Sequence, residues 1–162
     1  MERVSKKNYY LDIAQTVAER STCLRKRYGA IIVKNDSIIS TGYNGAPRGR
    51  ENCCDKQFCM REKLGIPRGE RYELCRSVHA EANAIIAASR EEMLDADMYI
   101  SCLEGSSNEI VGDISSCAMC KRLVLNAGIR RVIFRDTKEK YHIVETRDWL
   151  INDDSLTGQL GY

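Results

Sequence analysis

Residues 79–85 read His79-Ala80-Glu81-Ala82-Asn83-Ala84-Ile85, and residues 117–120 read Cys117-Ala118-Met119-Cys120. Each stretch begins a run of apolar residues at helical spacing, and the runs end near Ala88 and Ala127. Ser77 precedes the first run, and Ser115 or Ser116 precedes the second; serine is a common residue at helix starts. We therefore expect both motifs in the first turn of a helix.

These residue types together predict a metal site. One imidazole and two thiolates supply three of the four ligands that tetrahedral zinc prefers, and a fourth position left to water makes such a site catalytic. Cys117 and Cys120 lie three residues apart on one side of a helix, where they can bind one ion. Glu81 is placed to contact the bound water as a proton shuttle. The sequence thus predicts zinc ligands at His79, Cys117 and Cys120, with Glu81 as the catalytic residue.

Each residue also has a less specific interpretation. A lone His79 would more often be a hydrogen-bonded core residue. Cys117 and Cys120 alone could form half of a structural zinc site or a redox pair, although no thioredoxin-like context accompanies them. The joint occurrence of all four residues at helix starts favours catalytic zinc.

With these motifs, the chain resembles the zinc-dependent cytidine and deoxycytidylate deaminases, whose signature is H-x-E followed by P-C-x-x-C. The resemblance covers roughly Tyr10 to Phe134 and is closest to the deoxycytidylate (dCMP) branch. This chain departs from the family at Ser116, where proline is usual, and in a longer stretch from Glu104 to Ser115. Three further segments carry the likeness: Ser21-Thr22-Cys23-Leu24-Arg25, Gly29-Ala30-Ile31-Ile32-Val33 and Gly42-Tyr43-Asn44-Gly45-Ala46-Pro47.

The resemblance implies a three-layer α/β/α fold with a central five-stranded mixed sheet and the two zinc helices side by side. It implies hydrolysis of dCMP to dUMP and ammonia in pyrimidine nucleotide metabolism, with Glu81 moving the protons. Asn44 would contact the sugar or base, and Ala80 would offer backbone polar groups to the pyrimidine. Arg48 or Arg25 could bind the 5′-phosphate through a bidentate contact, although either could equally be a solvated surface residue.

Cysteine usage predicts a second, structural zinc. The polar loop at about residues 44–76 contains Cys53, Cys54, Cys59 and Cys75, and Cys23 lies just before the first strand. Four thiolates would make a closed tetrahedral site that stabilises a loop too polar to pack by itself. We favour Cys23, Cys53, Cys59 and Cys75, but Cys54 could replace Cys53, and idle buried thiols are the alternative. Some relatives of the dCMP branch carry an additional zinc in these regions.

Length and composition bound the remaining possibilities. The 162 residues, 43% of them hydrophobic, predict one domain over residues 1–162. A net charge of +2 is too small for a nucleic-acid partner, whereas the positive charge near the predicted site suits a mononucleotide phosphate. No apolar run approaches a membrane span, and residues 1–10 lack an apolar signal core, so we expect a cytoplasmic protein without a membrane partner.

Hydrophobic periodicity predicts alternating helices and strands, which is typical of α/β layers. Residues 44–76 read as a loop with a short helix near 60–64, and residues 148–162 as a covering or oligomer-contact tail. A helix is expected over residues 9–20 and strands over 30–33, 37–41, 98–102 and 131–134, with a turn at Asn35-Asp36.

Several alternatives remain open at this point. Another deaminase of the superfamily could act on a nucleoside, on tRNA adenosine, or on a pterin or riboflavin precursor. A non-catalytic, zinc-braced nucleotide-binding module is a rival from a different class, and an intact Glu81 argues against it. The resemblance leads us to expect a homo-oligomer, dimeric or hexameric, in which dCTP and dTTP could act as effectors. Residues 104–115 lie where they could reshape the edge of the pocket.

Overall fold

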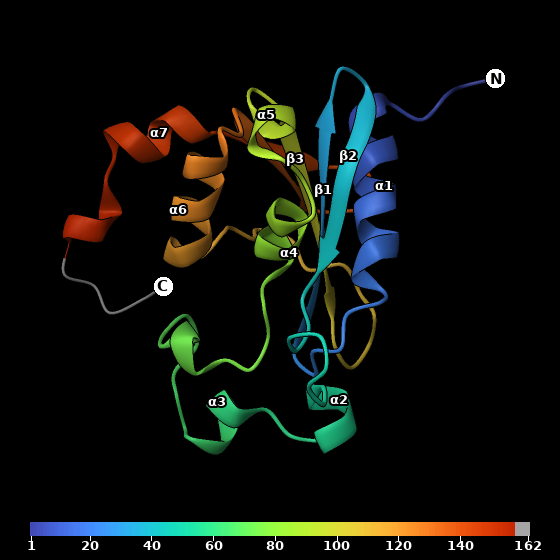
Figure 1. Ribbon diagram of the computed structural model, residues 1–162. Coiled ribbons are helices and arrows are strands. Elements are labelled where there is room, and N and C mark those ends of the chain that lie inside the picture. The colour runs from blue at the N-terminus through green and yellow to red at the C-terminus, as the bar shows by residue number, and fades with distance from the viewer. Residues whose placement is uncertain (158–162) are drawn as a thin grey trace.

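A mixed sheet of five strands lies between two layers of helices in the computed structural model, which describes residues 1–157 (Figure 1). The strand order is β2-β1-β3-β4-β5; only the β3–β4 pair is parallel. The predicted α/β fold with a five-stranded mixed sheet is confirmed. The strands are β1 (Lys26–Lys34), β2 (Ser37–Tyr43), β3 (Asp97–Glu104), β4 (Arg131–Arg135) and β5 (Tyr141–Glu145).

Helices and short helical turns occupy the segments between the strands. They are α1 (Lys6–Ala18), α2 (Cys53–Lys56), α3 (Met60–Lys63), η1 (Tyr72–Leu74), α4 (Ala80–Ile86), α5 (Arg90–Met93), α6 (Ala118–Ala127), α7 (Thr146–Ile151) and η2 (Asp154–Leu156). Helix α1 covers one face of the sheet, whereas α4, α5 and α6 lie on the other face (Figure 1). The segments that contain α2 and α3 extend beyond the ends of the strands.

The hairpin of β1 and β2 turns at Asn35-Asp36, as predicted. Both residues have positive φ, 50° and 60°, a conformation that Asn and Asp tolerate better than most residues. On one side of the sheet, Leu11 and Ala14 of α1 are fully buried against β1 and β3. A Cβ atom on Gly29 would lie 2.1 Å from the Ala14 carbonyl oxygen, so only glycine permits this close packing.

The other face of the sheet positions the two motif helices. A Cβ atom on Gly42 of β2 would lie 2.3 Å from the Ala84 backbone nitrogen, which shows how closely α4 approaches the sheet. Helix α4 also contacts α6, so the expected side-by-side packing of these helices is present. Their buried residues, Ala80, Ala84 and Val124, share one core with Ile100 and Phe134. This core fixes the two helix starts relative to each other.

Some local predictions were wrong. The N-caps are His79 for α4 and Cys117 for α6, so neither Ser77 nor Ser115 or Ser116 caps its helix. Helix α1 is capped by Ser5 and begins at Lys6, earlier than expected. Strand β5 and helices α2 and α5 had no predicted counterpart in the hydrophobic pattern.

The C-terminal segment packs partly onto α6. Trp149 of α7 contacts the core, the Lys121 ammonium lies 5.6 Å from its ring centroid, and Lys121 pairs with Asp154 at 2.8 Å. Leu150 and Ile151 stay about two-thirds exposed, at 66% and 67%. The predicted tail therefore covers α6 in part, while residues 158–162 lie outside the described residues.

No helix within residues 1–157 has the length and apolar character needed to cross a membrane.

Candidate active site

The three predicted zinc ligands come together. The His79 Nδ1 atom lies 3.5 Å from Cys117 Sγ and 3.4 Å from Cys120 Sγ. Tetrahedral zinc, with Zn–N near 2.0–2.1 Å and Zn–S near 2.3 Å, separates such N and S atoms by about 3.6 Å. These positions therefore fit a zinc ion. Among residues 1–157, no other group of three His, Cys, Asp or Glu side chains has its ligand atoms within 4.8 Å of one another.

Neighbouring helix starts place these ligands. His79 is the N-cap of α4, Cys117 is the N-cap of α6, and Cys120 lies in the first turn of α6. Because each N-cap residue is extended (φ −71° and −68°), the chain turns into the helix at the ligand itself. The positive end of the α6 dipole also favours a thiolate there.

The three side chains shift one another's pKa values. A hydrogen bond with Cys120 lowers the pKa of the Cys117 thiol to about 4, with His79 assisting and burial opposing. The pKa of Cys120 is raised, chiefly by the same bond with Cys117. Burial acts to lower the pKa of His79, but hydrogen bonds with Cys117 and Cys75 raise it to about 10. The cluster thus contains a ready thiolate ligand, and metal binding would release protons.

Glu81 lies beside this cluster, in the first turn of α4, and only 5% of it is exposed. The Ser116 hydroxyl donates a hydrogen bond to its Oε1 atom at 3.0 Å. The carboxylate also raises the pKa of Cys120, after the larger effects of Cys117 and burial. Glu81 is therefore close enough to the ligands to exchange a proton with a molecule bound there.

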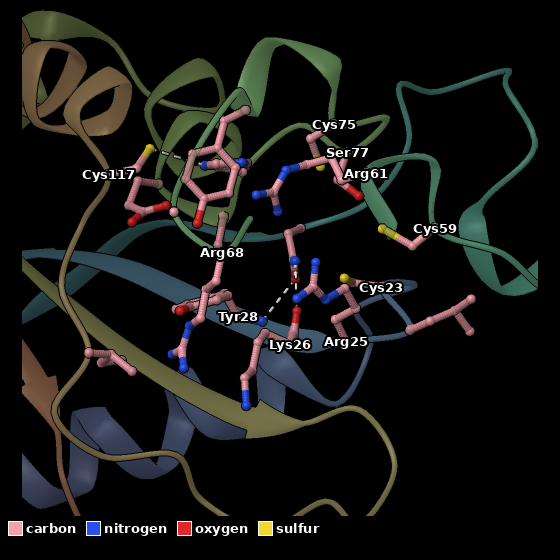
Figure 2. Close-up of a pocket in the computed structure, with 18 of the residues that line it drawn as sticks. Cys23, Arg25, Lys26, Tyr28, Cys59, Arg61, Arg68, Cys75, Ser77 and Cys117 are labelled. Carbon is pink, nitrogen blue, oxygen red and sulfur yellow. Dashed lines mark hydrogen bonds between the residues drawn. The ribbon is translucent and has the colours of Figure 1, made fainter. Parts of the chain in front are cut away.

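A pocket of about 570 Å³ opens onto Glu81 and the ligands His79 and Cys117. This volume lies in the range of small-molecule sites. Four basic side chains line it: Arg25, Lys26, Arg61 and Arg68. In Figure 2, Arg25 and Lys26 lie on one side of the pocket, and Arg61, Cys75 and Ser77 lie on the other. Four acidic side chains also line it: Glu62, Glu81, Glu104 and Asp113. The pocket therefore offers an anionic ligand local basic contacts beside His79 and Cys117, and not a net positive charge.

The predicted substrate contacts differ in position. Ala80, fully buried at the start of α4, lines the pocket. Asn44 also lines it, but its Oδ1 accepts from the Tyr28 backbone N–H at 2.8 Å and its Nδ2 donates to the Lys26 carbonyl at 2.9 Å. Its amide therefore supports β1. Arg48 is exposed and does not line this pocket, whereas Arg25, the alternative, does.

The thiols favoured for a structural zinc are neighbours, but they do not form a compact ligand group. Cys23, Cys59 and Cys75 line the pocket. Burial raises the pKa of Cys53, and these three thiols raise it further. No three of these sulfurs lie within 4.8 Å of one another. The Cys75 thiol is a hydrogen-bond neighbour of His79, whose pKa it raises. The four-thiolate site therefore remains a prediction.

The segment between β3 and α6 forms part of the pocket wall. It folds back on β3 through a bridge between Leu103 and Ile110, and Glu104 N–H donates to the Glu109 carbonyl at 2.8 Å. Its last residues, Asp113, Ile114 and Ser115, line the pocket. The longer stretch therefore reaches the pocket edge, as its sequence position indicated.

Sequence reasoning missed Arg61, which holds the loop between α3 and α4. Its side chain is buried, with 6% exposed, and it donates to the Glu70 carbonyl at 2.7 and 3.1 Å and to the Pro67 carbonyl at 3.0 Å. An arginine within a polar loop carries no sequence signal of such a role.

Comparison with known proteins gives a consistent family match. Residues 4–136 match the model of the cytidine and deoxycytidylate deaminase zinc-binding region. Deoxycytidylate deaminase of Mycobacterium phage D29 is 34% identical over 139 residues, which covers 83% of this chain and 97% of the phage protein. The deoxycytidylate deaminase of Schizosaccharomyces pombe is 31% identical over 132 residues, which covers 82% of this chain but only 37% of the yeast protein.

The fold comparison agrees. The crystal structure of dCMP deaminase from the cyanophage S-TIM5, in complex with dCMP and dUMP, superimposes with a TM-score of 0.58 at 26% sequence identity. The match covers 85% of each chain.

Proposed function

The chain belongs to the cytidine and deoxycytidylate deaminase family, and on this basis we propose that it hydrolyses dCMP to dUMP and ammonia. The observation that carries the proposal is the His79, Cys117 and Cys120 cluster beside the buried Glu81, at one wall of a pocket large enough for a small molecule. Relatives named deoxycytidylate deaminase and the cyanophage enzyme with dCMP and dUMP support the choice of this substrate.

Zinc bound by His79, Cys117 and Cys120 would supply a Lewis acid that lowers the pKa of water in the open fourth position. Glu81 accepts one proton from the attacking water and donates it to N3 of the cytosine ring; it then accepts the proton of the hydroxyl group added at C4 and donates that proton to the amine, which leaves as ammonia. Its burial favours this role because a site shielded from bulk water confines proton exchange to the molecules bound beside Glu81.

Arg25 is the residue we propose for the 5′-phosphate. Lys26 pairs with Glu104, and Arg61 is bound to loop carbonyls, so both are engaged elsewhere. Arg25 contacts Glu62 through Nε at 3.0 Å, but its buried Nη1 atom has no hydrogen-bond partner among the described residues. A phosphate oxygen would satisfy that donor. Arg68 lines the same pocket and could contribute a second guanidinium.

Further parts of the proposal follow from the sequence and the family. A second zinc would be held by Cys23, Cys53, Cys59 and Cys75. Residues 1–162 would form a single domain that acts in the cytoplasm as a homo-oligomer, with dCTP and dTTP as effectors. Neighbouring thiols around Cys53 support the second zinc.

The test measures ammonia release by the zinc-loaded protein with dCMP, CMP, deoxycytidine and dCTP, each with and without added dCTP as effector. Preferred turnover of dCMP is the expected result. Inactivity on all four substrates, with zinc content verified, would refute dCMP deamination and favour another aminopyrimidine substrate or the binding module.

A further inference from the structure

One hydrogen bond joins the two helices that carry the zinc ligands. Ser116 Oγ donates to Glu81 Oε1 at 3.0 Å, and only 3% of Ser116 and 5% of Glu81 are exposed. Ser116 directly precedes Cys117, the N-cap of α6, whereas Glu81 belongs to α4. The bond is thus a buried, charge-assisted contact between the two halves of the site.

We propose that Ser116 is a positioning residue for Glu81: its hydroxyl holds one carboxylate oxygen and leaves the other for proton transfer. This inference rests on the proposed deamination. A carboxylate in the first turn of a short helix can occupy several rotamers, and a donor on Oε1 selects among them. A fixed carboxylate accelerates proton transfer because it need not reorient during the reaction.

Helix initiation does not explain this hydroxyl. Cys117, not Ser116, is the N-cap of α6, and the Ser116 hydroxyl bonds across to α4. The family signature has proline at this position, and proline begins helices well but has no side-chain donor. The hydroxyl therefore provides an interaction that the usual residue cannot make.

The experiment compares Ser116→Ala, Ser116→Thr and Ser116→Pro with the natural protein. Ser116→Ala and Ser116→Pro are expected to lower kcat for dCMP about tenfold while KM stays within about twofold, because the contact orients the shuttle and does not bind substrate. Ser116→Thr keeps a hydroxyl and should retain about half of kcat or more. Zinc content is measured for each protein. The matched control is Ser101→Ala, which removes an equally inaccessible hydroxyl (0% exposed) that has no hydrogen-bond partner among residues 1–157.

A second measurement is independent of turnover. In protein labelled with ¹³C at the glutamate side-chain carboxyl, the Glu81 resonance is identified by its loss in Glu81→Gln. We expect it to shift in Ser116→Ala and Ser116→Pro but not in Ser116→Thr or Ser101→Ala. An unshifted resonance, or an unchanged kcat in Ser116→Ala, would overturn the inference. If the natural protein does not deaminate dCMP, the proposed function fails, and the resonance alone decides whether Ser116 holds Glu81.

Discussion

The guanidinium carbon of Arg61 lies 4.4 Å from the centroid of the Tyr72 ring. The Tyr72 ring in turn packs in a T-shaped arrangement with the His79 imidazole, with a centroid separation of 5.2 Å and an interplanar angle of 86°. Arg61 thus connects the loop between α3 and α4 to His79, one of the proposed zinc ligands. The packing limits the tilt of the imidazole and keeps its Nδ1 atom directed at the two thiols.

Replacing Arg61 by alanine should lower the free energy of unfolding by about 2–3 kcal/mol. The loss of its buried guanidinium would leave the Glu70 and Pro67 carbonyls without their hydrogen-bond donor. We also expect a higher KM for dCMP, since the loop forms one wall of the pocket. Urea unfolding and steady-state kinetics measure the two effects.

Lys63→Ala is the matched control for this variant. Lys63 also stands over an aromatic ring, with Nζ 4.8 Å from the Phe58 centroid, but it is exposed. Its removal should change the free energy of unfolding by less than about 0.5 kcal/mol. Equal effects of the two variants would contradict a bracing role for Arg61.

Glu81→Gln should reduce kcat by about 10²–10⁴-fold, because the amide cannot carry a proton between water and substrate. The amide oxygen can still accept the Ser116 hydrogen bond, so the fold should be unaffected. Metal analysis should find an unchanged zinc content. Retained turnover would show that Glu81 is not the shuttle.

The number of zinc ions per chain tests the proposed structural site. We expect two in the natural protein and one in Cys53→Ser, because the buried Cys53 thiol lies among the other three cysteines. Cys54→Ser should keep both ions, since the Cys54 thiol contacts Asp55 at 3.8 Å. A single zinc ion per chain in the natural protein would rule out the second site. If only Cys54→Ser loses a zinc ion, Cys54 is the ligand in place of Cys53.

Asp97 should contribute stability that depends on pH. Burial acts to raise its pKa, but hydrogen bonds from Arg131 and Arg130, each with Nε at 2.9 Å, lower it below the ordinary value of 3.8. Because the folded-state pKa is the lower one, this contribution is fully present above the unfolded-state pKa and disappears as pH falls through the folded-state value.

Asp97→Asn should therefore lower the free energy of unfolding by about 2 kcal/mol at pH 7 and pH 5. The difference from the natural protein should shrink below about pH 4, where the carboxyl becomes protonated. Urea titrations at pH 7, 5 and 3 measure it. Asp95→Asn serves as the control, because Asp95 has no ion-pair partner within residues 1–157. If the difference in free energy of unfolding between Asp97→Asn and the natural protein grows toward low pH, the Asp97 carboxylate does not stabilise the fold through its ion pairs.

Local chemistry at short spacing could be predicted from the sequence. His79, Cys117 and Cys120 were recognisable because zinc chemistry restricts both residue type and spacing, and the helix starts bring them together as expected. The Asn35-Asp36 turn was predictable because few residues tolerate positive φ. The pair Cys117 and Cys120 and the turn are each constrained within a few residues, whereas His79, 38 residues before Cys117, was recognised by its residue type beside Glu81.

Contacts between distant segments could not be predicted in this way. Ser116 looked like a helix cap, but its hydroxyl bonds to Glu81 on another helix. Strand β5 has only half-buried and exposed residues, so its hydrophobic pattern is weak and its pairing with β4 identifies it. Arg48 and Arg25 were equivalent in sequence, and only the fold shows which one lines the pocket.

That difference in position gives the last prediction. Arg25→Ala should raise KM for dCMP by about tenfold or more, because a charged hydrogen bond to phosphate would be lost, and it should leave KM for deoxycytidine nearly unchanged. Arg147→Ala, at an exposed position on α7, controls for the loss of one positive charge. If Arg48→Ala raises KM for dCMP instead, the phosphate lies near Arg48 and the pocket assignment of Arg25 is wrong. If Arg25→Ala raises KM equally for dCMP and deoxycytidine, Arg25 supports the shape of the pocket through its ion pair with Glu62 of α3 and does not recognise the phosphate.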